Sequence, residues 1–244
     1  LLKERLEKRG CTGKKIETIN AGVWGHSSYQ GAISYVKFVK KWKPDLVTLS
    51  YGANDKATLE GTQRHTRDRL LYKMPDEGSA SPYATLPEWG ITKILRLVSA
   101  LFTEEKNEGG NRSTPGEYRE NLEYLIDTIE KDGASVVLVD IGVNDDRYRK
   151  VFEETARSKK LPMINSEKIF DREIKAVLSG EKYAEQKKLI DSWLKPDAKF
   201  PQNHKSRYLT IDDMHPNMIG HDILADELAG VICNAQNYKN KTNE

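Results

Sequence analysis

The segment Asp212-Asp213-Met214-His215-Pro216 holds residue types that could carry out acid–base chemistry. Pro216 disfavours helical backbone at His215 and suits the first turn of the helix expected to follow, so the imidazole is held on a defined loop. Asp212 lies three residues before His215, close enough within a turn to accept a hydrogen bond from one ring nitrogen and leave the other as a base. The spacing predicts the orienting pair of a hydrolase. The alternative is that Asp212 only caps the following helix, beside a surface histidine.

Two glycine-bearing loops contain groups that could stabilise a developing negative charge. The first loop, residues 20–28, includes Gly25, whose N–H can approach a ligand closely because glycine has no Cβ. The second loop, residues 51–55, includes Asn54, whose side-chain amide can donate to an oxyanion without titrating, and Gly52, which allows a tight turn. Taken alone, each loop is better explained as an ordinary turn.

The elements that must position these loops alternate between strand and helix. Alternation with uninterrupted apolar strands predicts an α/β domain, in which a doubly wound, flavodoxin-like parallel sheet carries helices on both faces. Ligands bind at the carboxyl ends of the strands in such sheets, which is where both loops begin, so we expect the loops to share one crevice. Apolar runs predict strands at residues 16–19, 46–50, 136–141 and 161–164. Helical spacing predicts helices over residues 2–6, 29–42 and 118–129, a helix through Phe152, and a helix over residues 219–232.

The size and charge of the chain set further bounds. A length of 244 residues fits a single domain, residues 1–244. The 39 basic and 37 acidic residues give a net charge of +2, which provides no strong field for nucleic acid, and no apolar run is long enough to cross a bilayer. Cys11 and Cys233 lack metal-binding spacing, although a disulfide between them stays open. His215 and His221 are six residues apart and would not share a helix face, so we expect no metal site.

Residues 56–112 read as an insertion. This stretch is long and rich in turn residues, and it contains one predicted amphipathic helix. Because the insertion leaves directly from the Asn54 loop, the helix could cover the site as a lid, or it could pack on the body of the domain. The apolar stripe of this helix includes Ile91, Leu95, Val98 and Phe102.

Together, the three chemical segments resemble the SGNH/GDSL family of serine hydrolases. Residues 20–28 are similar to the second block of the family, residues 52–55 to its G-x-N-D block, and residues 212–216 to its final D-x-x-H-P block, in the same order. The resemblance covers the chain to about Cys233 and leaves the insertion outside the common core. It implies an SGNH-type fold and cleavage of a small-molecule, lipid or carbohydrate ester, with no cofactor.

The resemblance also implies a role for each matching residue. His215 would act as general base and then acid, with Asp212 as its orienting partner. Gly25 and Asn54 would form the oxyanion hole. Gly52 and Asp55 would support the Asn54 loop.

The expected nucleophile does not lie within residues 1–244. The family places its serine in a Gly-Asp-Ser segment at the end of the first strand, and this sequence contains no such segment. The chain opens inside a helical pattern, with Leu2 and Leu6 on one face, so we expect the first strand and its serine to lie upstream and the chain as given to be inactive. Ser27 and Ser28 are poor substitutes because no nucleophile-elbow pattern surrounds them.

Two other functions are consistent with the same fold. The first is a non-catalytic relative that binds an acyl or carbohydrate ligand in the same crevice. The second, a nucleotide binder, is disfavoured because no glycine-rich phosphate loop follows any predicted strand. Nothing in the sequence indicates a cellular location.

Overall fold

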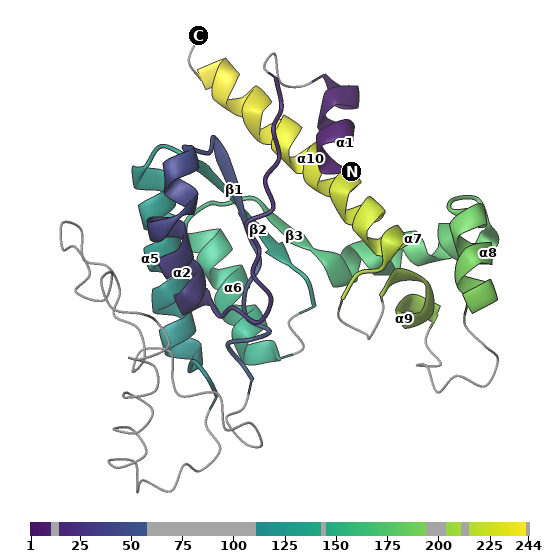
Figure 1. Cartoon of the computed structure of the whole chain (residues 1–244), viewed down its shortest axis with the longest axis horizontal. Helices are drawn as coiled ribbons and strands as arrows, with labels where there is room; N and C mark the ends of the chain where they lie inside the picture. The colour runs from purple at the N-terminus through teal and green to yellow at the C-terminus, as the bar shows by residue number, and fades with distance from the viewer. Residues whose placement is uncertain (11–14, 58–110, 143–144, 194–203, 211–214, 243–244) are drawn as a thin grey trace, which may run out of the picture.

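The computed structural model describes residues 1–10, 15–57, 111–142, 145–193, 204–210 and 215–242. Its three strands, β1 (Leu46–Leu49), β2 (Ser135–Asp140) and β3 (Met163–Asn165), form a parallel sheet in the order β1-β2-β3. Helices lie on both faces of this sheet (Figure 1), so the predicted α/β architecture is confirmed. The helices are α1 (Leu2–Arg9), α2 (Ser28–Lys37), the 3-10 helix η1 (Val39–Trp42), α5 (Pro115–Lys131), α6 (Asp146–Ser158), α7 (Ser166–Ser179), α8 (Ala184–Trp193), α9 (His204–Leu209) and α10 (Met218–Thr242).

Strand β2 is buried on both faces, and its successive side chains point into two different cores. Val136 and Leu138 pack in a core built from α2, α5 and α6. Val137 and Val139 pack in a second core with residues of α7, α9 and α10. This alternation follows from the two-residue period of a strand, and it explains why the sequence of β2 is a continuous apolar run.

Helix α5 illustrates how local sequence fixes an element next to the site. Thr114 begins the helix in a capping box, since its Oγ1 accepts from the Glu117 N–H at 3.2 Å and its own N–H donates to the Glu117 carboxylate at 2.8 Å. Pro115 occupies the first turn, and Gly133 follows the end of the helix with a φ of 89°. The buried stripe consists of Tyr118, Leu122, Leu125, Ile126 and Ile129, as predicted, together with Asn121.

The N-terminal helix α1 is fastened to α10. The Arg5 guanidinium donates to Asp222 at 2.7 Å, and Arg9 pairs with Asp226 at 3.0 Å. Burial would raise the pKa of Asp222, but hydrogen bonds from Arg5 and Tyr183 outweigh burial and lower it. Cys233 on α10 is disulfide-bonded, and the other cysteine of the sequence is Cys11, which lies outside the described residues.

Three sequence-based expectations differ from the structure. Residues 16–19 were expected to form a strand, and this prediction is wrong: the segment is extended but pairs with no described strand. A strand is defined by its neighbour, which a local pattern cannot supply. The last strand is shorter than expected, Met163–Asn165, and the helix predicted over 29–42 is divided into α2 and η1.

The insertion lies almost wholly outside the described residues. Residues 58–110 are not described, so the helix carrying Ile91, Leu95, Val98 and Phe102 stays a prediction, as does its role as a lid. Within the described part of the chain, no helix is long and apolar enough to cross a membrane.

Candidate functional site

The first loop is a tight turn fixed at several points. The His26 N–H donates to the Val23 carbonyl at 3.2 Å, and Gly25 within the turn has a φ of 79°, a left-handed conformation that glycine adopts without strain. Helix α2 starts immediately afterwards in a capping box between Ser27 and Gln30. The Arg112 guanidinium donates to the Gly25 carbonyl at 2.7 Å. The position of Gly25 is therefore set by the turn, the helix start and a distant arginine.

The second loop follows β1 and touches the first. Gly52 has a φ of 117°, and its carbonyl accepts from the Lys56 N–H at 3.0 Å, which closes the tight turn expected there. The Asn54 side-chain amide donates to the His26 carbonyl at 3.1 Å. An amide has two N–H donors, so this bond orients the group while using one of them. The two loops lie together, as the fold predicted, with Gly25 and Asn54 on either side of His26.

The buried side chain of Asp55 connects the two loops through hydrogen bonds. Its carboxylate has no exposed surface and accepts from the Ser28 N–H at 3.0 Å, the Ser28 hydroxyl at 2.6 Å and the Gly52 N–H at 3.2 Å. Burial raises the pKa of Asp55, although the hydrogen bonds from Ser28, Ser113 and Gly52 oppose this rise. A buried carboxylate that satisfies donors from both loops holds them at a fixed separation.

The loop serines are engaged in this support. Ser28 Oγ donates to Asp55 and accepts from Asn121 Nδ2 at 3.2 Å, and Ser27 Oγ accepts from the Gln30 N–H at 3.4 Å. Both serines are fully buried. Their contacts and burial agree with a structural role and disfavour either serine as a nucleophile.

Tyr118 of α5, which is buried, supports the second loop at Tyr51. The Tyr118 hydroxyl donates to the Tyr51 carbonyl at 3.0 Å. Burial, with a smaller contribution from the Asp55 charge, raises the pKa of Tyr51 to about 12. Tyr51 also fills the space above Gly31, where a Cβ would lie 2.1 Å from the tyrosine oxygen. Any larger residue at position 31 would displace the Tyr51 ring.

His215 lies on a separate segment, directly before α10, and its side chain is exposed. The segment is held after His215: Pro216 forms a bridge with Thr210, and the Asn217 N–H donates to the Leu209 carbonyl at 3.0 Å. Asn217 Oδ1 caps α10 by accepting from the N–H groups of Ile219 and Gly220.

Asp212 and Asp213 lie outside the described residues, so the pairing of Asp212 with His215 stays a prediction. The cap of α10 is provided by Asn217, which is the role that the alternative interpretation gave to Asp212.

Sequence reasoning missed two residues of this arrangement, Asn121 and Arg112. Asn121 carried a usable signal, because a polar residue beside Tyr118 and Leu122 falls on the apolar face of α5 and must find a buried partner. Arg112 gave no such signal, since it precedes the helix and its partners are distant in sequence.

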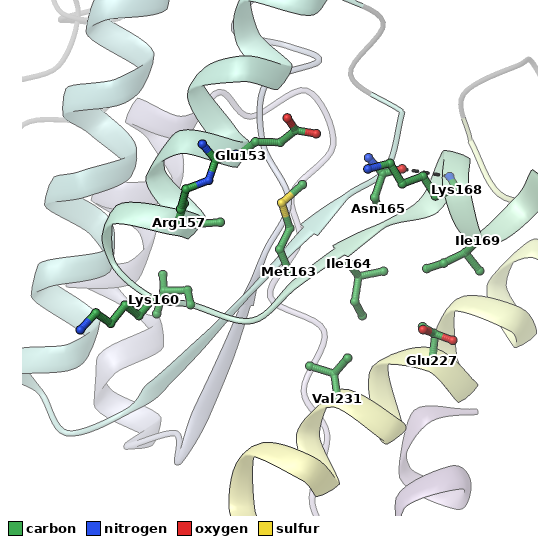
Figure 2. A pocket seen from close by; sticks show the side chains of 12 residues that line it. Glu153, Arg157, Lys160, Met163, Ile164, Asn165, Lys168, Ile169, Glu227 and Val231 are labelled. Atoms are coloured by element: carbon green, nitrogen blue, oxygen red, sulfur yellow. Dashed lines mark hydrogen bonds between the residues drawn. The ribbon is translucent and has the colours of Figure 1, made fainter. Parts of the chain in front are cut away.

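A groove of about 570 Å³ lies at the opposite edge of the sheet, away from the two loops. Figure 2 shows Met163 and Ile164 of β3 at its floor, with Arg157 of α6 and Val231 of α10 on either side. Lys160 and Lys168 extend at its rim. The groove contains neither Gly25 nor Asn54, so it is not the predicted ester site.

Comparison with known proteins identifies the family of the chain. A search of curated proteins finds no match. The family model described as GDSL-like Lipase/Acylhydrolase matches residues 3–228, which include both loops, the His215 segment and the first part of α10. Because this match spans nearly the whole chain, the protein belongs to the GDSL-like lipase/acylhydrolase family.

Proposed function

We propose that this protein hydrolyses acyl esters by a Ser-His-Asp mechanism. His215 serves as the base, Asp212 as its orienting partner, and the Gly25 N–H and Asn54 amide as oxyanion donors. The observation that carries the proposal is the junction of the two loops, where Asn54 Nδ2 lies 3.1 Å from the His26 carbonyl, one residue from Gly25. Two donors on separate loops, locked by a buried carboxylate, match the preorganisation that an oxyanion hole requires.

The proposed reaction runs in two symmetrical halves. The serine oxygen attacks the ester carbonyl while His215 takes the hydroxyl proton, and the carbonyl electron pair moves onto the oxygen held by Gly25 and Asn54. When the intermediate collapses, the ester C–O bond breaks and His215 gives its proton to the leaving alkoxide. Water then repeats the sequence on the acyl-enzyme and releases the acid. Each oxyanion donor is expected to contribute on the order of 3 kcal/mol to the transition state.

The serine in this proposal belongs to a strand segment outside residues 1–244. The free edge of β1 supports this assignment, because no described strand pairs with it. The segment that precedes α2 pairs with no described strand either, and it exposes Ile19 and Val23 by 54% and 53%. A strand placed along β1 would end near the loop that follows Leu49, since parallel strands bring their carboxyl ends to one edge.

The upstream coding sequence and a set of variants test the proposal. We expect a Gly-Asp-Ser segment upstream of Leu1, aryl-ester hydrolysis by the protein that includes it, and none by residues 1–244 alone. In the active protein, His215→Ala should lower kcat by about 10⁴-fold or more, and Asp212→Ala should cost more than its neighbour Asp213→Ala.

Other outcomes would redirect the assignment. Equal or inverted effects of the two aspartate variants would mean that the wrong carboxylate was chosen. Loss of activity in Ser28→Ala, with the upstream serine dispensable, would move the nucleophile to the loop. An upstream sequence without Gly-Asp-Ser would leave a protein that binds acyl or carbohydrate ligands without cleaving them.

A further inference from the structure

Arg112 is an arginine with only 7% exposed surface, and it lies just before α5. Its backbone is tied to the second loop, because the Arg112 N–H donates to the Ala57 carbonyl at 2.9 Å and the Ser113 N–H donates to the Asp55 carbonyl at 3.0 Å. The base of the Arg112 side chain is therefore fixed relative to Asp55.

The guanidinium reaches across to the first loop with both of its terminal nitrogens. Nη1 donates to the Gly25 carbonyl at 2.7 Å, and Nη2 donates to Gln30 Oε1 at 2.6 Å. These are short, charge-assisted bonds, stronger than those between neutral groups. Gln30 Oε1 also accepts from the Ser27 N–H at 3.3 Å. The planar guanidinium group of Arg112 thus holds the turn at Gly25 and the start of α2 in a single geometry.

The guanidinium of Arg112 fixes the peptide that directly follows the Gly25 N–H. Glycine at a φ of 79° has many alternatives open to it, because it lacks the Cβ that would restrict rotation. Arg112 holds the carbonyl of Gly25, Asn54 holds the carbonyl of His26, and the His26 N–H closes the turn on Val23. These bonds fix the peptide on the carboxyl side of Gly25 and both ends of the turn, and the peptide that carries the Gly25 N–H lies between these fixed points.

We infer that Arg112 is a positioning residue for the oxyanion donor Gly25, and this inference rests on the proposed ester hydrolysis. Arg112 acts through the Gly25 backbone and does not touch the reacting atoms. A lysine could not replace it, because an ammonium offers a point charge where two parallel N–H groups are needed. The loss of Arg112 should therefore weaken transition-state stabilisation more than substrate binding.

Kinetics of Arg112→Lys and Arg112→Ala in the ester-hydrolysing protein test the role. We expect kcat to fall by about 10- to 100-fold, with KM changed by less than about 3-fold, since misdirecting one donor costs less than deleting it. Guanidinium ion should restore at least part of the kcat of Arg112→Ala, whereas methylammonium should not. The control is Arg119→Ala, which removes an arginine of α5 that pairs with Glu154 on the surface; it should leave kcat unchanged.

Two results would overturn the inference. The first is an unchanged kcat in Arg112→Lys. The second is a loss of activity in Arg112→Ala that is fully explained by a smaller fraction of folded protein and is not restored by guanidinium ion. The amide resonance of Gly25 in residues 1–244 provides a second reading that needs no catalysis. In Arg112→Lys it should broaden or shift, while that of Gly133, whose N–H donates to the Glu130 carbonyl at 3.0 Å, should not move. A protein without esterase activity would refute the proposed function, and an unperturbed Gly25 amide would refute the role of Arg112.

Discussion

The two edges of the sheet differ in how they meet solvent. At the β3 edge, the strand is three residues long, and Arg157, Lys160 and Lys168 line the groove beside it. Short edge strands flanked by cations resist pairing with another chain, because extending the sheet there would bury charge. This edge has the features of a place where the sheet ends.

The β1 strand is also short, at four residues, but apolar side chains rather than a groove lined by cations lie exposed beside it. No described strand pairs with it, and Thr48 in the middle of the strand is exposed. The neighbouring extended segment presents apolar side chains to solvent, and Trp24 at its end is 95% exposed. Ile16 at the start of this segment and Leu46 of β1 pack against the same apolar cluster, formed by Leu6 with residues of α10. Both flanks are thus anchored, and no described strand pairs with the edge between them.

The two edges of the sheet therefore differ in how readily another strand could pair with them. A guarded edge terminates a sheet, whereas an unguarded edge next to an exposed apolar strand-like segment is suited to receive a strand. The loop junction of Gly25, Asn54 and Asp55 lies at the β1 side, so a strand received there would reach the proposed site. The groove at the β3 side needs no ligand to explain it.

The largest expected effect on stability concerns the buried carboxylate that follows β1, compared with the helix-capping residue at the end of β3. Asp55→Asn should lower the free energy of unfolding by on the order of 3 kcal/mol, because it sets an amide donor against the buried donors of Ser28 and Gly52. The matched change after β3 is Asn165→Ala, which removes only the cap that accepts from the Lys168 N–H at 3.0 Å. It should cost about 1 kcal/mol. Urea denaturation of both variants measures the difference, and equal costs would show that Asp55 is not a special support.

A comparison of the wild type with Asp55→Asn also gives a pH test. Because burial raises the pKa of Asp55, the folded state binds this proton more tightly than the unfolded chain does. Through this group, the stability of the wild type should fall as the pH rises from about 4, the value for an unfolded aspartate, towards the folded pKa. The side-chain amide of the variant does not titrate, so the advantage of wild type over Asp55→Asn should shrink as the pH rises. An advantage that grows with pH would mean that the pKa of Asp55 is lowered.

The sequence was sufficient for the elements whose pattern is local. The apolar run of β2 and the stripe of α5 identify themselves within a few residues, and so do the glycines that end α1 and α5. Residues 16–19 have the pattern of a strand as well, but a strand needs a partner, and that requirement is not local. Sequence reasoning consequently failed at the β1 edge, where pairing determines the structure.

The candidate site likewise contains residues that could be proposed from the local sequence and contacts that could not. Gly25 and Asn54 could be proposed from their residue types and the order of the segments. The bonds that hold them join residues far apart in sequence: 27 positions between Ser28 and Asp55, 87 between Gly25 and Arg112, and 93 between Ser28 and Asn121. No local pattern predicts such partners, because they meet only when the sheet and α5 have assembled.

Hydrogen exchange provides a test of the edges themselves. The Asp45 carbonyl accepts from the Ser135 N–H at 2.9 Å, so Thr48, three residues later, turns its N–H away from β2. Met163 turns its N–H away from β2 in the same manner, because the Pro162 carbonyl accepts from the Leu138 N–H at 3.0 Å. If a strand of the longer protein pairs with β1, the Thr48 amide should exchange at least about 100-fold more slowly there than in residues 1–244. The Met163 amide should exchange alike in both proteins. Equal exchange of Thr48 in the two proteins would refute a strand at this edge.

The smallest expected effect on stability concerns the cations at the β3 edge. Lys160→Asn with Lys168→Gln removes two exposed charges from the groove, and asparagine suits the φ of 54° at position 160. The melting temperature should hardly move, since exposed substitutions of this kind change stability by less than about 0.5 kcal/mol. Self-association should nevertheless rise with protein concentration in light scattering, because the lysines no longer guard the free edge. The control, Lys3→Gln with Lys8→Gln on α1, makes the same change in net charge away from either edge and should stay as monodisperse as the wild type. If both pairs of variants associate equally, net charge and not edge protection keeps the protein apart, and the contrast between the two edges loses its physical basis.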